Sequence, residues 1–145
     1  MNDVYITKAG KCLPNEPISN DEMESYLGLI NEKASKARRI VLRNNGIKTR
    51  YYALDKNGNP THTNADLTNT AIEQLYDDSF SKYDVEMLSC GTSTPDNLLP
   101  SHAAMVHGLM KNKSVELNSS SGVCCAGMNA LKVGYLSVKS GSTQN

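Results

Sequence analysis

The 145-residue sequence predicts an α/β fold, and two observations support this prediction. Short apolar stretches that suit strands are followed in turn by stretches whose apolar residues recur three and four positions apart, as in amphipathic helices. Glycine, proline and asparagine separate these stretches, as is typical of turns. The resulting order of strand then helix, repeated four times, is characteristic of helices layered on a sheet.

The first predicted strand covers residues 3–14, where Val4 and Ile6 alternate with more polar neighbours. A long amphipathic helix is predicted next, because Ser19 and Glu22 have the spacing of a capping box and Gly46 provides a stop. The remaining predicted elements are a strand over 47–54, a helix over 64–75 with Asn64 as its N-cap, a strand over 85–93, a helix over 100–111 opened by Pro100, a strand over 115–117, and a helix over 126–141 with Met128, Leu131, Tyr135 and Val138 on one face.

Composition excludes several classes of protein. Fifteen lysines and arginines balance 15 aspartates and glutamates, which argues against a general nucleic-acid binder. No apolar stretch approaches the ~20 residues of a membrane span, and the first residues do not resemble a secretory signal. We therefore expect a cytoplasmic protein without a membrane or nucleic-acid partner. The cysteines show no CxxC pair, which predicts reduced thiols and no metal site; they are Cys12, Cys90, Cys124 and Cys125.

The stretch "SSSGVCCAGMNALK" places Cys125 between a predicted strand and the start of a predicted helix. A thiol attacks as its thiolate, and the unpaired amides of a helix N-terminus favour that negative charge. Small residues at Ala126 and Gly127 would leave room for a substrate carbonyl to reach those amides. The pattern therefore predicts Cys125 as a nucleophile beside an oxyanion-binding amide. The alternative is that both adjacent cysteines are buried core thiols, and we expect this of Cys124.

Four stretches resemble, in order and spacing, the N-terminal half of type III beta-ketoacyl-acyl carrier protein synthases, which are thiolase-like condensing enzymes. They are "VYITKAGKCLPNEPISNDEME", "NNGIKTRYYA", "LSCGTSTPDNLLPSHAA" and "CCAGMNAL". The resemblance spans nearly the whole chain, and the "CAG" at Cys125 is its most specific part. It implies that residues 1–145 form the N-terminal half-domain of a five-layer αβαβα fold.

The resemblance also implies a reaction in fatty-acid biosynthesis. The cysteine matching Cys125 takes an acyl group as a thioester from coenzyme A or acyl carrier protein, with no cofactor beyond these thioester substrates. A malonyl-carrier protein is then decarboxylated, and its carbanion attacks the thioester in a Claisen condensation. The family implies a homodimer, in which the residue matching Leu99 reaches across to shape the partner's acyl pocket. Leu99 could equally be an ordinary apolar contact.

Three features depart from the family pattern. The family's catalytic histidine and asparagine belong to its C-terminal half, and the three histidines here do not match them; we expect His62, His102 and His107 to be surface or loop residues. Ile40 stands where coenzyme A users often have tryptophan. The serine-rich segment 118–125 is closer to divergent secondary-metabolite members. We therefore expect this piece to be inactive without the C-terminal half of the same enzyme.

Three alternative functions remain open. The chain could belong to an acyltransferase that forms no carbon–carbon bond, to a ketosynthase of the resorcinol or polyene type, or to a non-catalytic partner subunit. A basic cluster is either an attraction site for phosphates or an acidic carrier protein, or simply a solvated helix face. Its members are Lys33, Lys36, Arg38, Arg39, Arg43, Lys48 and Arg50.

Overall fold

The computed structural model describes residues 2–145 and divides them into two compact units. The first unit contains the N-terminal segment up to Cys12 together with residues 64–145, and the second contains residues 13–63. The predicted cysteine nucleophile lies in the first unit, and most of the basic cluster lies in a helix and its flanks in the second. Each unit is described separately below.

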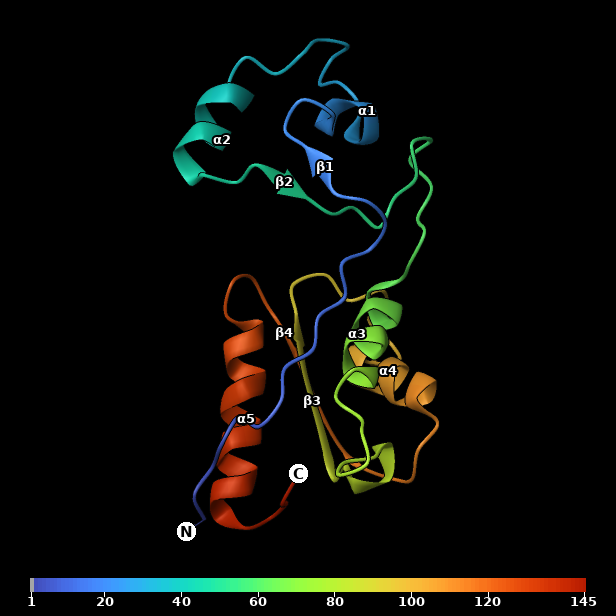
Figure 1. The fold of residues 1–145 in the computed structure, drawn as a ribbon, viewed down its shortest axis with the longest axis vertical. Helices are drawn as coiled ribbons and strands as arrows, with labels where there is room; N and C mark the ends of the chain where they lie inside the picture. The colour runs from blue at the N-terminus through green and yellow to red at the C-terminus, as the bar shows by residue number, and fades with distance from the viewer. Residues whose placement is uncertain (1) are drawn as a thin grey trace. The chain divides into compact units, whose positions relative to one another are not determined.

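Two parallel strands form the sheet of the first unit. Strand β3 (Met87–Thr92) pairs with β4 (Glu116–Ser121) in a register that sets Met87 opposite Glu116 and Thr92 opposite Ser121. Helix α5 (Ala126–Ser140) packs on one face of this sheet, and α4 (His102–Met110) packs on the other with α3 (Asn64–Glu73) beside it (Figure 1). The unit is therefore a three-layer α/β arrangement, which confirms the predicted class.

Side chains of β3 alternate between these two layers. Leu88 and Cys90 enter the core that the sheet forms with α3 and α4, whereas the Ser89 side chain reaches α5. This alternation follows from the two-residue repeat of a strand. The core residues are Ala65, Val85, Leu88, Cys90, Ala103, Val106 and Met110.

Helix α3 begins where the sequence predicts, but its N-terminus is capped from a distance. The Asp96 carboxylate accepts hydrogen bonds from the backbone N–H groups of Asn64 at 2.7 Å and Ala65 at 2.9 Å. The Asn64 side chain, predicted to be the cap, instead donates to Thr92 and to the Thr94 carbonyl. A carboxylate suits this position because its charge opposes the positive end of the helix dipole. The loop after β3 is thereby attached to the start of α3.

The strand predicted over residues 3–14 does not form. Residues 2–14 have no helix or strand, although residues 2–12 belong to the first unit. The Asn2 N–H donates to the Lys139 carbonyl at 3.3 Å, and the Lys8 ammonium pairs with the Asp77 carboxylate at 2.6 Å. These contacts are with helix α5 and with the turn after α3, and a strand needs a neighbouring strand for its backbone groups.

The long helix predicted from Ser19 to Gly46 is interrupted. The second unit has two short helices, α1 (Met23–Leu27) and α2 (Arg38–Asn45), and a two-stranded antiparallel sheet of β1 (Ile18–Ser19) and β2 (Thr49–Arg50). Gly28 ends α1 at φ 79°, and Asn31 and Glu32 also have positive φ. Three left-handed positions in one segment are incompatible with a continuous helix. The Glu24 carboxylate bonds the Arg38 guanidinium at 3.1 Å, which joins the two helices.

Candidate functional site

The site is the turn between β4 and α5. Cys125 is the N-cap residue of α5, and Cys124 before it has a left-handed φ of 67°. The Cys125 N–H donates to the Val123 carbonyl at 2.8 Å, so the chain reverses within three residues. Turns of this kind around a positive φ are uncommon for residues with a side chain. The sharp turn joins the end of the strand directly to the start of the helix.

The N-terminus of α5 is open to an anion. Among residues 2–145 no side chain caps it, and its first intrahelical hydrogen bond runs from the Asn129 N–H to the Cys125 carbonyl at 2.9 Å. The N–H groups of the first turn of α5, which come before Asn129, therefore have no carbonyl partner within the helix. A Cβ atom at Gly127 would meet no heavy atom within 4 Å, so there is space beside these donors. The arrangement can stabilise negative charge on a sulfur or on a carbonyl oxygen placed here.

Gly91 brings the sheet against the first turn of α5. A Cβ atom at this position would lie 2.2 Å from the Ala126 carbonyl oxygen and 2.7 Å from the Gly127 nitrogen. Only glycine permits this approach, and Ala126 is 4 % exposed beneath it. Gly91 therefore holds the start of the helix close to β3. Its place in the interior of a predicted strand, where glycine is unfavourable, was a signal that could have identified it.

A hydrogen-bonded chain fixes the same helix further along. The Ser89 hydroxyl donates to the Ala130 carbonyl at 2.8 Å and accepts from the Asn118 amide at 2.9 Å. One side chain therefore connects β3, β4 and α5. The sequence alone gave no sign of this bridge, because it depends on the strand register.

The cysteines differ in burial. Cys125 is exposed, as a nucleophile requires, and Cys124 is exposed too, so its predicted core position is wrong. The positive φ of Cys124 explains the error, because the reversed backbone carries this residue outward. Cys90 is buried, and burial raises the pKa of its thiol to about 11. Cys12 is half-buried.

The three histidines have hydrogen-bond partners away from the cysteines. His102 is not the surface residue expected, because it is buried with its Nε2 3.2 Å from the Thr68 hydroxyl. It opens α4 and faces α3, which the helical spacing did not reveal. His107 Nε2 lies 2.9 Å from the Lys113 carbonyl, and His62 Nδ1 lies 2.9 Å from the Thr61 hydroxyl. None of these bonds brings a general base to Cys125.

Leu99 lies in the loop between β3 and α4, where it is 87 % exposed beside an equally exposed Leu98. Two large apolar side chains exposed in one loop are suited to an intermolecular contact. Its predicted role at a dimer interface stays a prediction.

The basic cluster belongs to the second unit, and part of it is engaged there. Arg38 pairs with Glu24, and the Arg50 guanidinium donates to the Asn20 side chain. Arg38, Arg39 and Arg43 line a small polar depression with Asn20 and Asp21. The Ile40 side chain is exposed on the helix. It is aliphatic, whereas the family that the chain resembles often has a tryptophan at the matching position.

Across residues 2–145, no helix combines the length and apolar character that crossing a membrane requires.

No protein-family model matches the chain. Curated relatives do match it along its length. It is 28% identical to a beta-ketoacyl-[acyl-carrier-protein] synthase III of Streptococcus sanguinis over 145 residues, and 26% identical to the Clostridium perfringens protein of the same name. These matches cover 99% and 100% of this chain. The chain spans 41% of the length of either relative.

Solved structures agree with this similarity. The tetronic acid condensing enzyme AbyA1 superposes with a TM-score of 0.73 at 26% identity, covering 90% of this chain and 39% of that one. The Thermus thermophilus beta-ketoacyl synthase III superposes with a TM-score of 0.72 at 23% identity, covering 96% and 40%. The chain is thus similar over its whole length to type III beta-ketoacyl-acyl carrier protein synthases and shares part of their thiolase-like α/β fold.

Proposed function

We propose that this chain is the acyl-accepting part of a type III-like ketoacyl synthase, with Cys125 as the nucleophile. The observation that carries the proposal is an exposed cysteine at the uncapped N-terminus of a 15-residue helix, directly after a parallel strand. The curated relatives named as beta-ketoacyl synthases support the reaction class, since their similarity extends through this turn.

In the proposed first step, the Cys125 thiolate attacks the carbonyl carbon of an acyl thioester. The resulting tetrahedral oxyanion is stabilised by amides of the first turn of α5, and the coenzyme A or phosphopantetheine thiolate leaves as the cysteine thioester forms. The uncapped amides support this assignment, because donors for the oxyanion must be free before the substrate arrives. No cofactor takes part in this transfer.

The second step is proposed to be decarboxylative condensation with a malonyl-carrier protein. It requires a histidine and an asparagine that the family resemblance assigns to a C-terminal half. The histidines of this chain do not supply these groups, because each forms its hydrogen bond with a residue other than Cys125. We therefore propose a cytoplasmic homodimer in which the C-terminal half completes each site and Leu99 contacts the other subunit's acyl pocket.

Mass spectrometry of the intact protein tests the first step. The chain is incubated with short and medium acyl-coenzyme A and with the corresponding acyl carrier proteins. We expect one acyl adduct on Cys125, absent in Cys125→Ala and retained in the matched control Cys124→Ser. An adduct that survives Cys125→Ala would overturn the assignment of the nucleophile.

The alternative functions give different results. An acyltransferase would form the adduct but would release no carbon dioxide from malonyl-carrier protein when the C-terminal half of a relative is added. A ketosynthase would release one carbon dioxide for each acyl group consumed. A non-catalytic subunit would form no adduct under either condition.

A further inference from the structure

Two exposed thiols lie next to each other in the chain at the start of α5. Of the four cysteines, all within the described residues 2–145, only Cys124 and Cys125 are exposed, whereas Cys90 is buried and Cys12 is half-buried. The acyl transfer proposed above needs one thiol, so it leaves Cys124 without a role. An accessible thiol beside a reactive one is the arrangement found in many redox-sensing sites, where the second thiol completes the oxidation of the first.

The backbone at Cys124 has a conformation that residues with a side chain rarely adopt. Its φ of 67° is left-handed, whereas Cys125 is right-handed with φ −107° and ψ −1°. Non-glycine residues in such conformations cluster at functional sites. Because the Cys124 side chain is exposed, core packing does not account for a cysteine at this position either.

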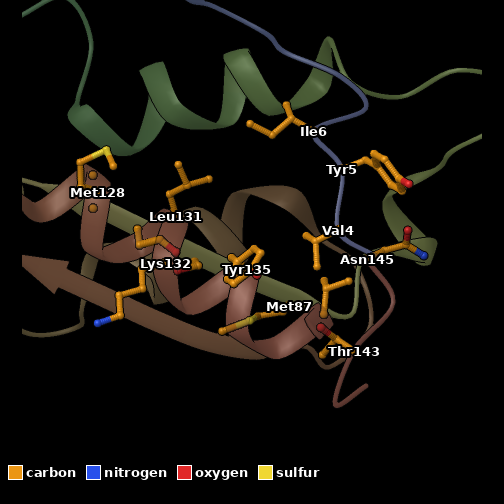
Figure 2. A pocket seen from close by; sticks show the side chains of 16 residues that line it. Val4, Tyr5, Ile6, Met87, Met128, Leu131, Lys132, Tyr135, Thr143 and Asn145 are labelled. Carbon is orange, nitrogen blue, oxygen red and sulfur yellow. Dashed lines mark hydrogen bonds between the residues drawn. The ribbon is translucent and has the colours of Figure 1, made fainter. Parts of the chain in front are cut away.

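The surroundings of the two thiols are open to small reagents. A groove of about 860 Å³ runs along α5, and Figure 2 shows Met128 and Thr143 far apart along it. Gly127 and Met128 line this groove, but neither cysteine does. A Cβ atom at Gly127 would meet no heavy atom within 4 Å, so there is also space beside the first turn of α5. A site with room for an acyl thioester admits a molecule as small as hydrogen peroxide.

A disulfide between these neighbours would be strained. The peptide bond between Cys124 and Cys125 is trans, which sets their Cα atoms about 3.8 Å apart. Ordinary disulfides join Cα atoms about 4.4–6.8 Å apart. Strained or exposed disulfides are reduced more readily than those that stabilise a fold. A disulfide at this turn would therefore be temporary, with the reduced thiols as the resting state.

We propose that Cys124 and Cys125 form a reversible disulfide when peroxide oxidises Cys125, and that this disulfide stops acyl transfer. The Cys125 thiolate first attacks one oxygen of hydrogen peroxide, so that an S–O bond forms, the O–O bond breaks and hydroxide leaves. The Cys124 sulfur then attacks the Cys125 sulfur, so that the S–S bond forms and the S–O bond breaks. The oxygen leaves as water with the Cys124 proton, and two electrons have passed from the thiols to the peroxide.

The disulfide also protects Cys125 from irreversible damage. A sulfenic acid without a neighbouring thiol is oxidised further to sulfinic acid, which thiols do not reduce. The disulfide is reversed by a dithiol, whose first thiolate attacks one sulfur and whose second thiolate displaces it, leaving the reductant as a cyclic disulfide. Formation of the disulfide depends on the two thiols alone, whereas its effect on acyl transfer rests on the function proposed for Cys125.

Mass spectrometry of the tryptic peptide 114–132 tests the proposal, because this peptide contains Cys124 and Cys125 and no other cysteine. The chain is treated with hydrogen peroxide, alkylated and digested, with and without dithiothreitol before alkylation. We expect the peptide to lose two hydrogens, to resist alkylation, and to recover both thiols after dithiothreitol. Cys124→Ser should instead gain two oxygens at Cys125 and should not recover. Cys12→Ser is the control and should behave as the original chain does.

Acylation of Cys125 is measured on the same samples. We expect it to fall at least tenfold after peroxide, and to return after dithiothreitol in the original chain but not in Cys124→Ser. A gain of oxygen on the peptide of the original chain, a disulfide that links two copies of the chain, or equal recovery in Cys124→Ser would overturn the proposal. If the disulfide forms within one chain but the untreated chain is not acylated, the function proposed for Cys125 fails and the disulfide stands.

Discussion

The thiols of Cys90 and Cys125 show how position decides what a cysteine can do. Both belong to the same unit, but Cys90 points from β3 into the core, whereas Cys125 is exposed at a helix start. Burial disfavours the charged thiolate, and this raises the pKa of Cys90 to about 11 from its ordinary value of 9.0. Cys90 is therefore a packing residue at neutral pH.

This difference predicts a pH dependence of stability. An unfolded Cys90 ionises near pH 9, while the folded thiol stays neutral until about 11, so stability is full below pH 9 and falls as the pH rises toward 11. The loss is at most about 2–3 kcal/mol, since each pKa unit corresponds to about 1.4 kcal/mol. Denaturant unfolding of wild type and Cys90→Ala should show a free-energy gap that narrows over this range. The half-buried Cys12→Ala is the control, and a gap that stays constant would contradict the prediction.

Gly91 gives a prediction at the site itself. Gly91→Ala places a methyl group against the backbone of Ala126 and Gly127, so the start of α5 must move away from β3. We expect a loss of about 1–3 kcal/mol in the free energy of unfolding and at least tenfold slower acylation of Cys125. Gly108→Ala in α4 is the matched control, because its Cβ would meet open space. Unchanged acylation in Gly91→Ala would show that this contact does not position the nucleophile.

At the level of whole elements, sequence patterns correctly predicted the helices and strands that are determined by contacts between residues close in the chain. Helices α3, α4 and α5 and strand β3 appear within a few residues of their predicted bounds, because each has its own periodicity and a stop such as Gly141. The prediction of one long helix in the second unit was wrong, because Gly28 and the left-handed residues after it interrupt the helix despite its amphipathic pattern. The predicted strand at residues 3–14 was also wrong, because a strand depends on a neighbour that no local pattern encodes.

The capping of α3 by Asp96 could not be predicted from the local sequence either, because Asp96 is distant from the helix in the chain. Asp96→Ala removes the acceptor of the Asn64 and Ala65 N–H groups, leaving two helix-start donors without their partner. We expect a loss of about 1–2 kcal/mol, measured as a lower midpoint in denaturant unfolding. Substitution of the exposed Asp78 by alanine should cost less than about 0.5 kcal/mol. Equal effects of the two substitutions would mean that the cap contributes nothing.

For the molecule as a whole, residues 13–63 form one compact unit and the rest of the described chain forms another. The Glu24–Arg38 pair links α1 to α2 within the second unit, and both side chains are about one-fifth exposed. The site predicted at Cys125 lies in the other unit, which explains why its surroundings could be predicted without a correct account of residues 13–63.

This division predicts a confined effect of Arg38→Ala. Hydrogen exchange should become faster in α1 and α2, because the carboxylate of Glu24 loses its partner, and should stay unchanged in β3 and α5. Lys36→Ala, which removes a charge without breaking a described ion pair, is the control. Faster exchange in β3 would show that the units unfold together.

The bridge at Ser89 has a mechanical consequence. A helix resting on a sheet through apolar contacts alone could slide along its axis by small steps at little cost, but a hydroxyl that bonds both Asn118 and the Ala130 carbonyl has one position in which both bonds are met. Ser89 thus fixes the position of α5 along its own axis at Ala130. Four residues earlier in the helix, the Ala126 peptide lies against Gly91. A polar side chain of the strand, bonded to the Ala130 carbonyl, therefore determines where the first turn of the helix lies against the sheet.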